Sequence, residues 1–357
     1  MDAAKPAELL EGALLADGWR VTQRLDRGAD ATGGTFSVPY LAERIVGATA
    51  EHAFCKALDF SNAPRMAAEA GCSVIDAFKS LTDAYVFERD LVLHCAGRRM
   101  TNVIRALTAG EFTITEHNFD PIYATVPYII FERADGDVRG KMASSAFDDA
   151  VKLRVLHGAA NGLRQLHGAQ VFHQDLKPSN VMLIGGSGKL GDLGRAMRSD
   201  SRGIWDDLLI AGDRTYAPPE LLYGGDLADP TTRRLACDAY HLGSLAMFLF
   251  TGSSLTPLVF AELPDEFHWR TWPRDFRNAL PYLRDAFGRV LDAEAGALSP
   301  TLGVDLLPVV RELGDPDPLV RGVPRGTGRS RYSMQRYVSI FDRLARRAEM
   351  VARGNMR

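Results

Sequence analysis

The segment 171–183, VFHQDLKPSNVML, gathers several reactive side chains between two short apolar runs. Asp175, Lys177 and Asn180 lie close together in it. A carboxylate can accept a proton, an ammonium group can neutralise an anion, and an amide oxygen can bind a hard metal ion. The short loop between Asp175 and Asn180 lets the two side chains converge on one point. A polar turn before an apolar strand would explain any one of these residues, but it does not explain the set.

This segment resembles the catalytic loop of protein kinases, whose pattern HxDxxxxN is matched by His173, Asp175 and Asn180. The resemblance implies that Asp175 accepts the proton of the substrate hydroxyl and that Asn180 binds a metal ion on the phosphates. Lys177 resembles the lysine that neutralises the transferred phosphoryl group in serine/threonine kinases. ATP is then the expected phosphoryl donor.

A second candidate metal ligand, Asp192, follows the next apolar run and precedes Leu193 and Gly194. An acidic residue followed by glycine is a common turn by itself. Its place after the catalytic loop resembles the magnesium-binding DFG motif, with Leu193 instead of Phe. Mg²⁺ prefers oxygen ligands and keeps phosphates and waters in its shell, so Asn180 and Asp192 are its expected protein ligands.

Lys56 lies in an apolar β-type run, AFCKALDF, where an unpaired charge would be costly to bury. The resemblance implies that this lysine holds the α- and β-phosphates and is positioned by a glutamate of the neighbouring helix. Glu88 is the expected partner, because Leu91 and Val92 follow it on the face that would pack inward. Asp90 is the alternative, and an exposed helix surface is the ordinary interpretation of Glu88.

A glycine cluster resembles the loop that covers the phosphates in kinases. Gly33 and Gly34 are expected to approach the phosphate, because a residue without a side chain lets the backbone come close. Thr32 and Ser37 stand where two other glycines are expected, and Gly28 precedes the cluster. Taken alone, the cluster would predict only a turn.

The segment YIIFERADGDV resembles the connection between kinase lobes, which binds adenine through backbone groups. Phe131 is then the gatekeeper, and Glu132 and Ala134 are the expected adenine contacts. Phe54, two residues before Lys56, stands where kinases usually have a small residue over adenine. A narrowed nucleotide pocket is therefore expected.

Three further residues have expected architectural roles. The segment AGDRTYAPPELL resembles the end of the kinase activation segment, so Glu220 is expected to pair with an arginine. Arg321 is the preferred partner, with Arg325 or Arg329 as alternatives. Asp238 is expected to hold the backbone of the catalytic loop.

Two departures from the kinase pattern bear on regulation and specificity. Gln174 replaces the arginine that reads a phosphate on the activation segment in many kinases, so activity is expected without that phosphate. Asp213 replaces a threonine that is usual in serine/threonine kinases. The nature of the acceptor hydroxyl therefore stays open.

The pattern along the chain predicts many strands first and mostly helices later. Strands are expected at 20–25, 37–45, 52–60, 103–108, 111–115 and 128–132, and helices at 77–95, 150–167, 235–250 and 334–353. The stretches 61–73, 224–232 and 321–331 look like turn-rich surface insertions. This order favours the α+β class. The resemblance implies the bilobal kinase fold, with an N-terminal extension at 1–18, a β-rich N-lobe with one main helix at 19–132, and a mostly helical C-lobe with a C-terminal helical extension at 133–357.

Composition is that of an ordinary globular protein. A net charge of −3 gives no electrostatic reason to expect nucleic acid or an anionic membrane as partner. The apolar stretch 235–260 is interrupted by Asp238 and Gly243, which favours a buried core helix over a membrane span. Four cysteines without CxxC spacing favour reduced thiols, and the N-terminus lacks the pattern of a signal peptide. A cytoplasmic location is therefore expected.

The resemblance extends from Trp19 to Arg321, with the motifs in the expected order. It implies a serine/threonine protein kinase of a bacterial subgroup, which uses ATP and Mg²⁺ to phosphorylate a protein substrate. Two other functions stay open. One is a pseudokinase scaffold, and the other is a small-molecule kinase of the antibiotic-phosphorylating kind, which shares HxDxxxxN. Lys177 and the PPE segment favour a protein substrate.

Overall fold

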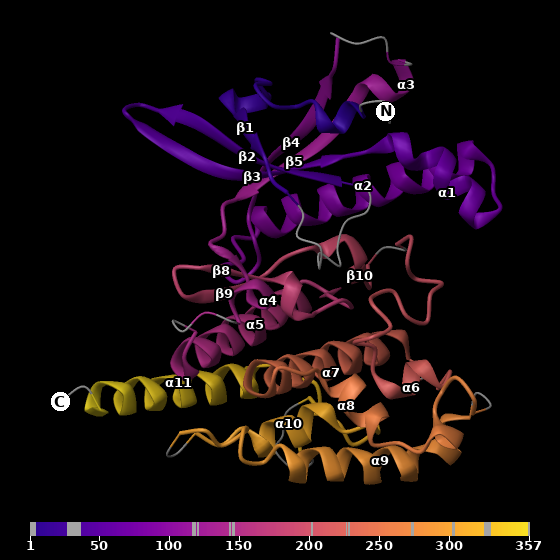
Figure 1. The fold of residues 1–357 in the computed structure, drawn as a ribbon, viewed down its shortest axis with the longest axis vertical. Helices are drawn as coiled ribbons and strands as arrows, with labels where there is room; N and C mark the ends of the chain where they lie inside the picture. Colours follow the sequence, from indigo (N-terminus) through magenta and orange to yellow (C-terminus); the bar gives the residue numbers. More distant parts are fainter. Residues whose placement is uncertain are drawn as a thin grey trace. The chain divides into compact units, whose positions relative to one another are not determined.

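The computed structural model describes residues 5–26, 37–115, 119, 121–142, 144, 147–200, 203–225, 227, 229–272, 275–301, 304–324 and 330–355. The glycine cluster with Gly28, Gly33 and Gly34 lies outside these residues. The chain divides into two compact units, Met1–Ala134 and Asp135–Arg357. The first unit is built on a sheet and the second is mostly helical, which confirms the α+β fold class (Figure 1).

The sheet of the first unit has five antiparallel strands in the order β1-β2-β3-β5-β4. The strands are β1 (Arg20–Arg24), β2 (Ser37–Val46), β3 (Thr49–Leu58), β4 (Ala106–Thr113) and β5 (Thr125–Glu132). Side chains alternate between the two faces of a strand. In β3, Ala53, Cys55 and Ala57 are fully buried, whereas Phe54 and Lys56 between them are partly exposed. The lysine therefore lies on the face opposite the main apolar cluster.

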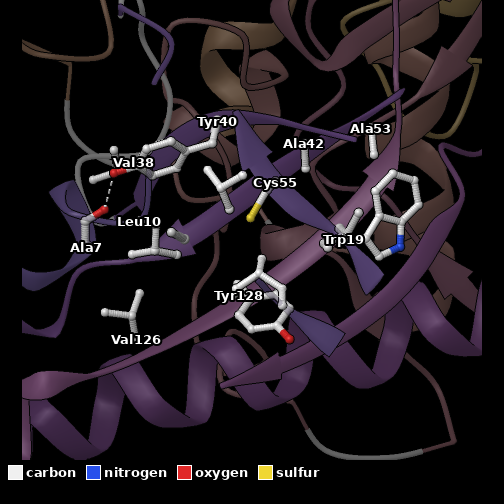
Figure 2. Close-up of a cluster of buried hydrophobic side chains, with 14 of the residues drawn as sticks. Ala7, Leu10, Trp19, Val38, Tyr40, Ala42, Ala53, Cys55, Val126 and Tyr128 are labelled. Carbon is white, nitrogen blue, oxygen red and sulfur yellow. Dashed lines mark hydrogen bonds between the residues drawn. The ribbon is translucent and has the colours of Figure 1, made fainter. Parts of the chain in front are cut away.

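The N-terminal segment packs against that apolar cluster (Figure 2). Leu10 and Trp19 are fully buried in it, together with residues of β2, β3 and β5. The Tyr40 hydroxyl donates a hydrogen bond to the Ala7 carbonyl at 2.7 Å, and the Tyr128 hydroxyl accepts one from a backbone N–H of the same segment. Residues before β1 thus complete the core of the first unit.

Helix α2 (Val74–Gly97) is the main helix of the first unit, and it contacts β4. Its buried face includes Tyr85, Glu88 and Leu91 at helical spacing, as the sequence predicts. The Tyr85 hydroxyl donates to the Tyr128 carbonyl of β5 at 3.3 Å. The Ser73 side chain caps the helix by accepting from a backbone N–H of the first turn.

Two sequence-based predictions for the first unit are wrong. The stretch 61–73, predicted as a turn-rich insertion, contains helix α1 (Ala63–Ala70). Pro64 lies in its first turn, where a missing N–H has no cost, and Gly71 ends it with φ +66°. Proline and glycine are thus end signals here, although the same residues suggested irregular chain.

The segments 103–108 and 111–115 form one strand, β4, instead of two. Gly110, in the gap between the two predicted strands, lies inside β4, and the Tyr128 ring fills the space beside it. A Cβ at Gly110 would lie 2.6 Å from the Tyr128 hydroxyl oxygen. The pairing of β4 with β5 shifts register between Ala106 and Thr108. The glycine therefore serves packing, which local sequence cannot reveal.

The second unit is built around long helices with small sheets (Figure 1). Its helices are α4 (Val138–Lys141), α5 (Asp149–Gly168), α6 (Pro219–Leu222), α7 (Pro230–Thr251), α8 (Leu255–Ala261), α9 (Phe276–Ala293), α10 (Leu307–Gly314) and α11 (Gln335–Asn355). Its strands are β6 (Gly136–Asp137), β7 (Val171–Phe172), β8 (Val181–Ile184), β9 (Ser187–Leu190) and β10 (Met197–Arg198), and α3 (Pro121–Ala124) belongs to the first unit. Helix α11 packs along α5, where Arg154 bonds Asp342 and Glu349 at 2.8 and 2.7 Å.

Helix α7 is the central helix of the second unit, and most of its side chains are buried. At Gly243 it approaches α10 so closely that a Cβ would lie 2.8 Å from the Leu313 side chain. No single helix among the described residues is long and apolar enough to cross a membrane. Helices α7 and α8 pass that test only together, across a bend of 78°.

A buried ion pair joins α6 to the segment after α10. Both nitrogens of the Arg321 fork lie 2.7 Å from the two carboxylate oxygens of Glu220. Arg321 is 0% exposed, and its guanidinium also donates to the Ala236 carbonyl. The predicted pair is therefore confirmed, while the interpretation of Arg321 as part of a surface insertion is wrong. The alternative partners, Arg325 and Arg329, lie outside the described residues.

We expect Arg321→Ala to lower the free energy of unfolding of the second unit by ~3–5 kcal/mol, because the change leaves the Glu220 carboxylate buried without its partner. Urea unfolding measures this loss. Arg284→Ala is the control, because that side chain is 43% exposed in its ion pair with Asp315 and its loss should cost less than about 1 kcal/mol. Energies of Glu220→Ala and Arg321→Ala that simply add in the double variant would contradict the pair.

Candidate active site

The first unit holds a paired lysine on the face of its sheet opposite the main apolar cluster. Lys56 Nζ lies 2.6 and 2.9 Å from the two carboxylate oxygens of Glu88, which is on the buried face of α2. The Glu88 side chain is only 9% exposed, so the ammonium group compensates a largely desolvated carboxylate. Asp90, the alternative partner, instead pairs with Arg89. Glu88 is therefore the partner of Lys56, as predicted.

Two aromatic side chains lie next to Lys56 on the sheet. Phe54 and Phe131 face each other across β3 and β5, with ring centroids 6.4 Å apart. The predicted adenine contacts follow Phe131 at the end of β5. The Glu132 N–H donates to the Arg105 carbonyl at 2.9 Å, so this backbone donor is already used. Ala134 is the last residue of the first unit.

The catalytic-loop residues come together in the second unit around Asp175. Its Oδ2 accepts a hydrogen bond from Asn180 Nδ2 at 3.1 Å and lies 3.2 Å from Lys177 Nζ. Its Oδ1 accepts from the Asp213 backbone N–H at 2.9 Å. These contacts fix the orientation of a carboxylate on a residue that is only 7% exposed. The convergence expected from sequence is thus observed.

Lys177 is shared between two carboxylates. Its Nζ lies 3.6 Å from Asp213 Oδ2, in addition to its contact with Asp175. The Asp213 side chain is 28% exposed, whereas that of Lys177 is 7% exposed. The preceding residue, Gly212, has no room for a side chain, because a Cβ would lie 2.6 Å from Asp175 Oδ1. The acidic residue in place of the usual threonine is thus part of the same charged group.

The two predicted magnesium ligands lie at the ends of one hairpin. Strands β8 and β9 pair directly after Asn180, and the Gly191 N–H donates to the Asn180 carbonyl at 2.8 Å. Asp192 follows Gly191 in the left-handed region, with φ +49°. His173 Nε2 lies 3.1 Å from the Gly191 carbonyl, which joins the catalytic loop to this strand end.

The donor set fits Mg²⁺. Both described side-chain hydrogen bonds of Asn180 use its Nδ2, which leaves the amide oxygen as the ligand atom. Asp192 supplies a carboxylate. Mg²⁺ typically takes one or two protein oxygen ligands and completes its octahedral shell with phosphates and waters. Among the described residues, no group of three or more His, Cys, Asp or Glu side chains offers a complete protein cage.

Asp238 on α7 holds the catalytic loop through hydrogen bonds to its backbone. Its carboxylate accepts from the backbone N–H groups of His173 and Gln174 at 2.9 and 2.8 Å. It also accepts from Gln174 Nε2 at 3.0 Å, and it lies 2.8 Å from His167 Nε2. Burial acts to raise the pKa of Asp238, but the contact with His167 and the backbone donors outweigh it, so the pKa lies below its usual value.

Sequence analysis missed two residues of this site, His167 and Gly212. His167 lies at the end of α5 and is linked to the catalytic loop only through Asp238. Gly212 is needed because of the close approach of Asp175. No local pattern marks either role, since both depend on segments that are distant in sequence.

Comparison with known proteins agrees with this geometry. Residues 88–263 match the model of the protein kinase domain. This range contains Glu88, the catalytic loop, Asp192, Glu220 and Asp238. The match covers just under half of the chain and shows that this part is similar to protein kinase domains. The strand-rich first unit and the helical second unit are the two lobes of the kinase fold.

Curated relatives are kinases at low identity. The chain is 30% identical over 158 residues to extracellular signal-regulated kinase 7 of Drosophila melanogaster, which covers 42% of the chain and 16% of the relative. It is 32% identical over 142 residues to a probable cyclin-dependent kinase 8 of Dictyostelium discoideum, covering 36% of each. It is 28% identical over 168 residues to the serine/threonine-protein kinase drp72 of Corynebacterium efficiens, covering 43% of the chain and 31% of the relative. These matches span well under half of each relative.

We expect Asp238→Asn to destabilise the second unit at pH 7 and to make its stability less dependent on acid pH. A carboxyl group whose pKa is lowered on folding contributes stability above its unfolded pKa, near 3.8, and loses it as the pH falls through the lower folded value. The difference in unfolding free energy between wild type and variant should therefore shrink below pH 4. Urea unfolding between pH 3 and 7 measures it, and a difference that is constant with pH would contradict the assignment.

Proposed function

We propose that the chain is an ATP- and Mg²⁺-dependent protein kinase that transfers the γ-phosphoryl group to Ser or Thr hydroxyls of a protein substrate. The observation that carries the proposal is the arrangement around Asp175. A carboxylate is oriented there by Asn180, Lys177 and the Asp213 backbone. Asn180 and Asp192, at the two ends of the β8–β9 hairpin, offer oxygen donors suited to Mg²⁺. Phosphoryl transfer needs positioned charges more than covalent chemistry, and these residues supply them.

Each residue has a distinct part in this mechanism. Asp175 orients the acceptor hydroxyl and takes its proton onto the carboxylate. Lys177 neutralises charge on the transferred group, as its position beside Asp175 allows. Lys56, held by Glu88, binds the α- and β-phosphates. Asn180 and Asp192 would hold Mg²⁺, which neutralises charge on the phosphates when bound.

The adenine would be bound by backbone groups at the end of β5. Because the Glu132 N–H is bonded to Arg105, we assign the Glu132 carbonyl and the Ala134 N–H to the base. Phe54 lies on the same sheet face as Lys56, across from Phe131. Its ring would narrow the space for the base. Gly33 and Gly34, which lie outside the described residues, keep their expected role at the phosphates.

Residues of the second unit support the proposed class of substrate. Lys177 and the short helix α6 that carries Glu220 favour a protein over a small molecule, because in kinases they support a peptide platform. Ser or Thr is the favoured acceptor, and relatives named as serine/threonine kinases support it. A bacterial origin is supported by the Corynebacterium relative. The free cysteines support a cytoplasmic location.

A pseudokinase scaffold is the second candidate function, favoured by Phe54 at the expected adenine site. Single-turnover transfer from labelled ATP to a protein mixture separates the two candidates, and phosphoamino-acid analysis identifies the acceptor. No transfer under any metal or acceptor condition would favour the scaffold. Labelled aminoglycosides without labelled protein would favour a small-molecule kinase.

We expect Lys56→Met and Asp192→Ala each to lower the phosphorylation rate by more than about tenfold, equivalent to ~1.4 kcal/mol, in a chain that stays folded. The reason is that both side chains act on the nucleotide and its metal. Lys56→Met should in addition lower thermal stability, because it leaves the Glu88 carboxylate without its partner. Matched controls are Lys79→Met and Asp200→Ala, whose side chains are 72% and 51% exposed, and both should keep wild-type rates. A variant at Lys56 or Asp192 that keeps most of its activity would show that its assigned role is wrong.

We expect phosphatase treatment to change the activity by less than about twofold. Gln174 bonds Asp238 and the Arg234 carbonyl, and its neutral amide cannot attract a phosphate as an arginine does. Candidate phosphorylation sites in the activation segment are Ser199, Thr215 and Ser201, the last of which lies outside the described residues. Rates before and after treatment are compared, with mass spectrometry as a check of dephosphorylation. Loss of most activity, regained on autophosphorylation, would contradict the expectation.

A further inference from the structure

An ion pair that none of the kinase motifs includes joins the activation segment, here residues 192–220, to helix α7. Arg234 Nη2 lies 2.8 Å from Asp206 Oδ1, and the side chains are 8% and 14% exposed. The second oxygen of Asp206 accepts from the Gly203 backbone N–H at 2.8 Å. One carboxylate therefore closes a tight turn and binds a buried guanidinium.

Arg234 contacts three parts of the second unit. Its Nη1 donates to the Arg198 carbonyl of β10 at 3.0 Å. Its backbone carbonyl accepts from Gln174 Nε2 of the catalytic loop at 2.9 Å. Its guanidinium carbon lies 5.9 Å from the centre of the Phe172 ring in β7. The residue thus links the catalytic loop and two places on the activation segment.

Trp205, the neighbour of Asp206, extends this link to the magnesium-ligand motif. Its indole N–H donates to the Gly194 carbonyl at 2.6 Å, two residues after Asp192. The Arg195 guanidinium lies over the same ring at 4.0 Å. The turn at 203–206 is therefore attached to the Asp192 motif through Trp205 and to the catalytic loop through Asp206 and Arg234.

The charges explain why Asp206 matters to this arrangement. A guanidinium that is buried needs a counter-charge, and removal of one partner of a buried pair is far more costly than loss of a surface pair. Arg234 Nε has no hydrogen-bond partner among the described residues, so its compensation depends on the two terminal nitrogens. One binds a neutral carbonyl, and the other binds Asp206. The Asp206 carboxylate is thus the negative group that compensates the charge of Arg234.

We propose that Asp206 and Arg234 are positioning residues that hold the activation segment in its working conformation, with a built-in carboxylate in the role that a phosphate has in many kinases. This inference rests on the proposed kinase function. It also explains why a neutral residue can stand at position 174. The cation that binds the activation segment is Arg234 of α7, and the Gln174 amide donates a hydrogen bond to its carbonyl. Loss of the pair should reduce kcat more than the affinity for ATP.

Steady-state kinetics of Asp206→Asn, Asp206→Glu and Asp207→Asn in the full chain test the proposal. Asp206→Asn keeps the shape but removes the charge, and we expect kcat to fall more than about tenfold while KM for ATP changes less than about threefold. Asp206→Glu restores the charge and should recover much of kcat. Asp207→Asn makes the same charge change on the adjacent, exposed residue and should match wild type. Equal kcat in Asp206→Asn and Asp207→Asn would overturn the proposal.

Hydrogen exchange gives a readout that does not need catalysis. In a Lys56→Met background, Asp206→Asn should increase exchange in residues 193–200 and 203–211 at least about fivefold over Asp207→Asn, because these residues open more often without the ion pair. Unchanged exchange would overturn the proposal that Asp206 and Arg234 hold the segment, even if activity falls. If the wild type transfers no phosphate at all, the proposed kinase function fails, whereas the exchange result still decides whether Asp206 holds the segment.

Discussion

The candidate active site depends on the hydrogen bonds that the Asp238 carboxylate accepts from the catalytic loop. This carboxylate lies on the largely buried helix α7 and accepts hydrogen bonds from two consecutive backbone N–H groups of the catalytic loop. Gln174 in that loop has φ +62°, an unusual conformation for a residue other than glycine, and Asp238 accepts from both its backbone and its side chain. The orientation of Asp175 follows from this loop geometry.

A common device recurs through the molecule: a cation that is shielded from water is paired with a carboxylate that is distant in sequence. Lys56 with Glu88, Arg321 with Glu220, and Arg234 with Asp206 are three such pairs. Such pairs add little net stability over apolar packing, but each is costly to break on one side only. They therefore define one arrangement of the segments that carry them. In the second unit, this holds α6 and the activation segment in place.

The errors of sequence interpretation concern glycine, proline and burial. The gap between the predicted strands 103–108 and 111–115 lies within one strand, and the stretch around Pro64, predicted as turn-rich, contains a helix. The role of Gly110 depends on a neighbouring strand, because the Tyr128 ring excludes a side chain at this position. Arg321 lies in a stretch that was predicted as a surface insertion, but its side chain is buried in an ion pair with Glu220. Local patterns report preference, whereas contacts between distant segments decide the outcome.

The sequence by itself determined the α+β class, the long helices α2, α5, α7 and α11, and the set of residues with reactive side chains, whereas it did not predict α9. Spacing was sufficient for Asp175 and Asn180, because a loop of that length leaves the two side chains close together. Only the tertiary structure decided that Asp213 shares Lys177, that His167 contacts Asp238, and that Asp206 meets Arg234. The partners in these contacts lie at least 28 residues apart in sequence. Periodicity and motif spacing describe neighbours along the chain, so they carry no information on which distant charges will be buried together.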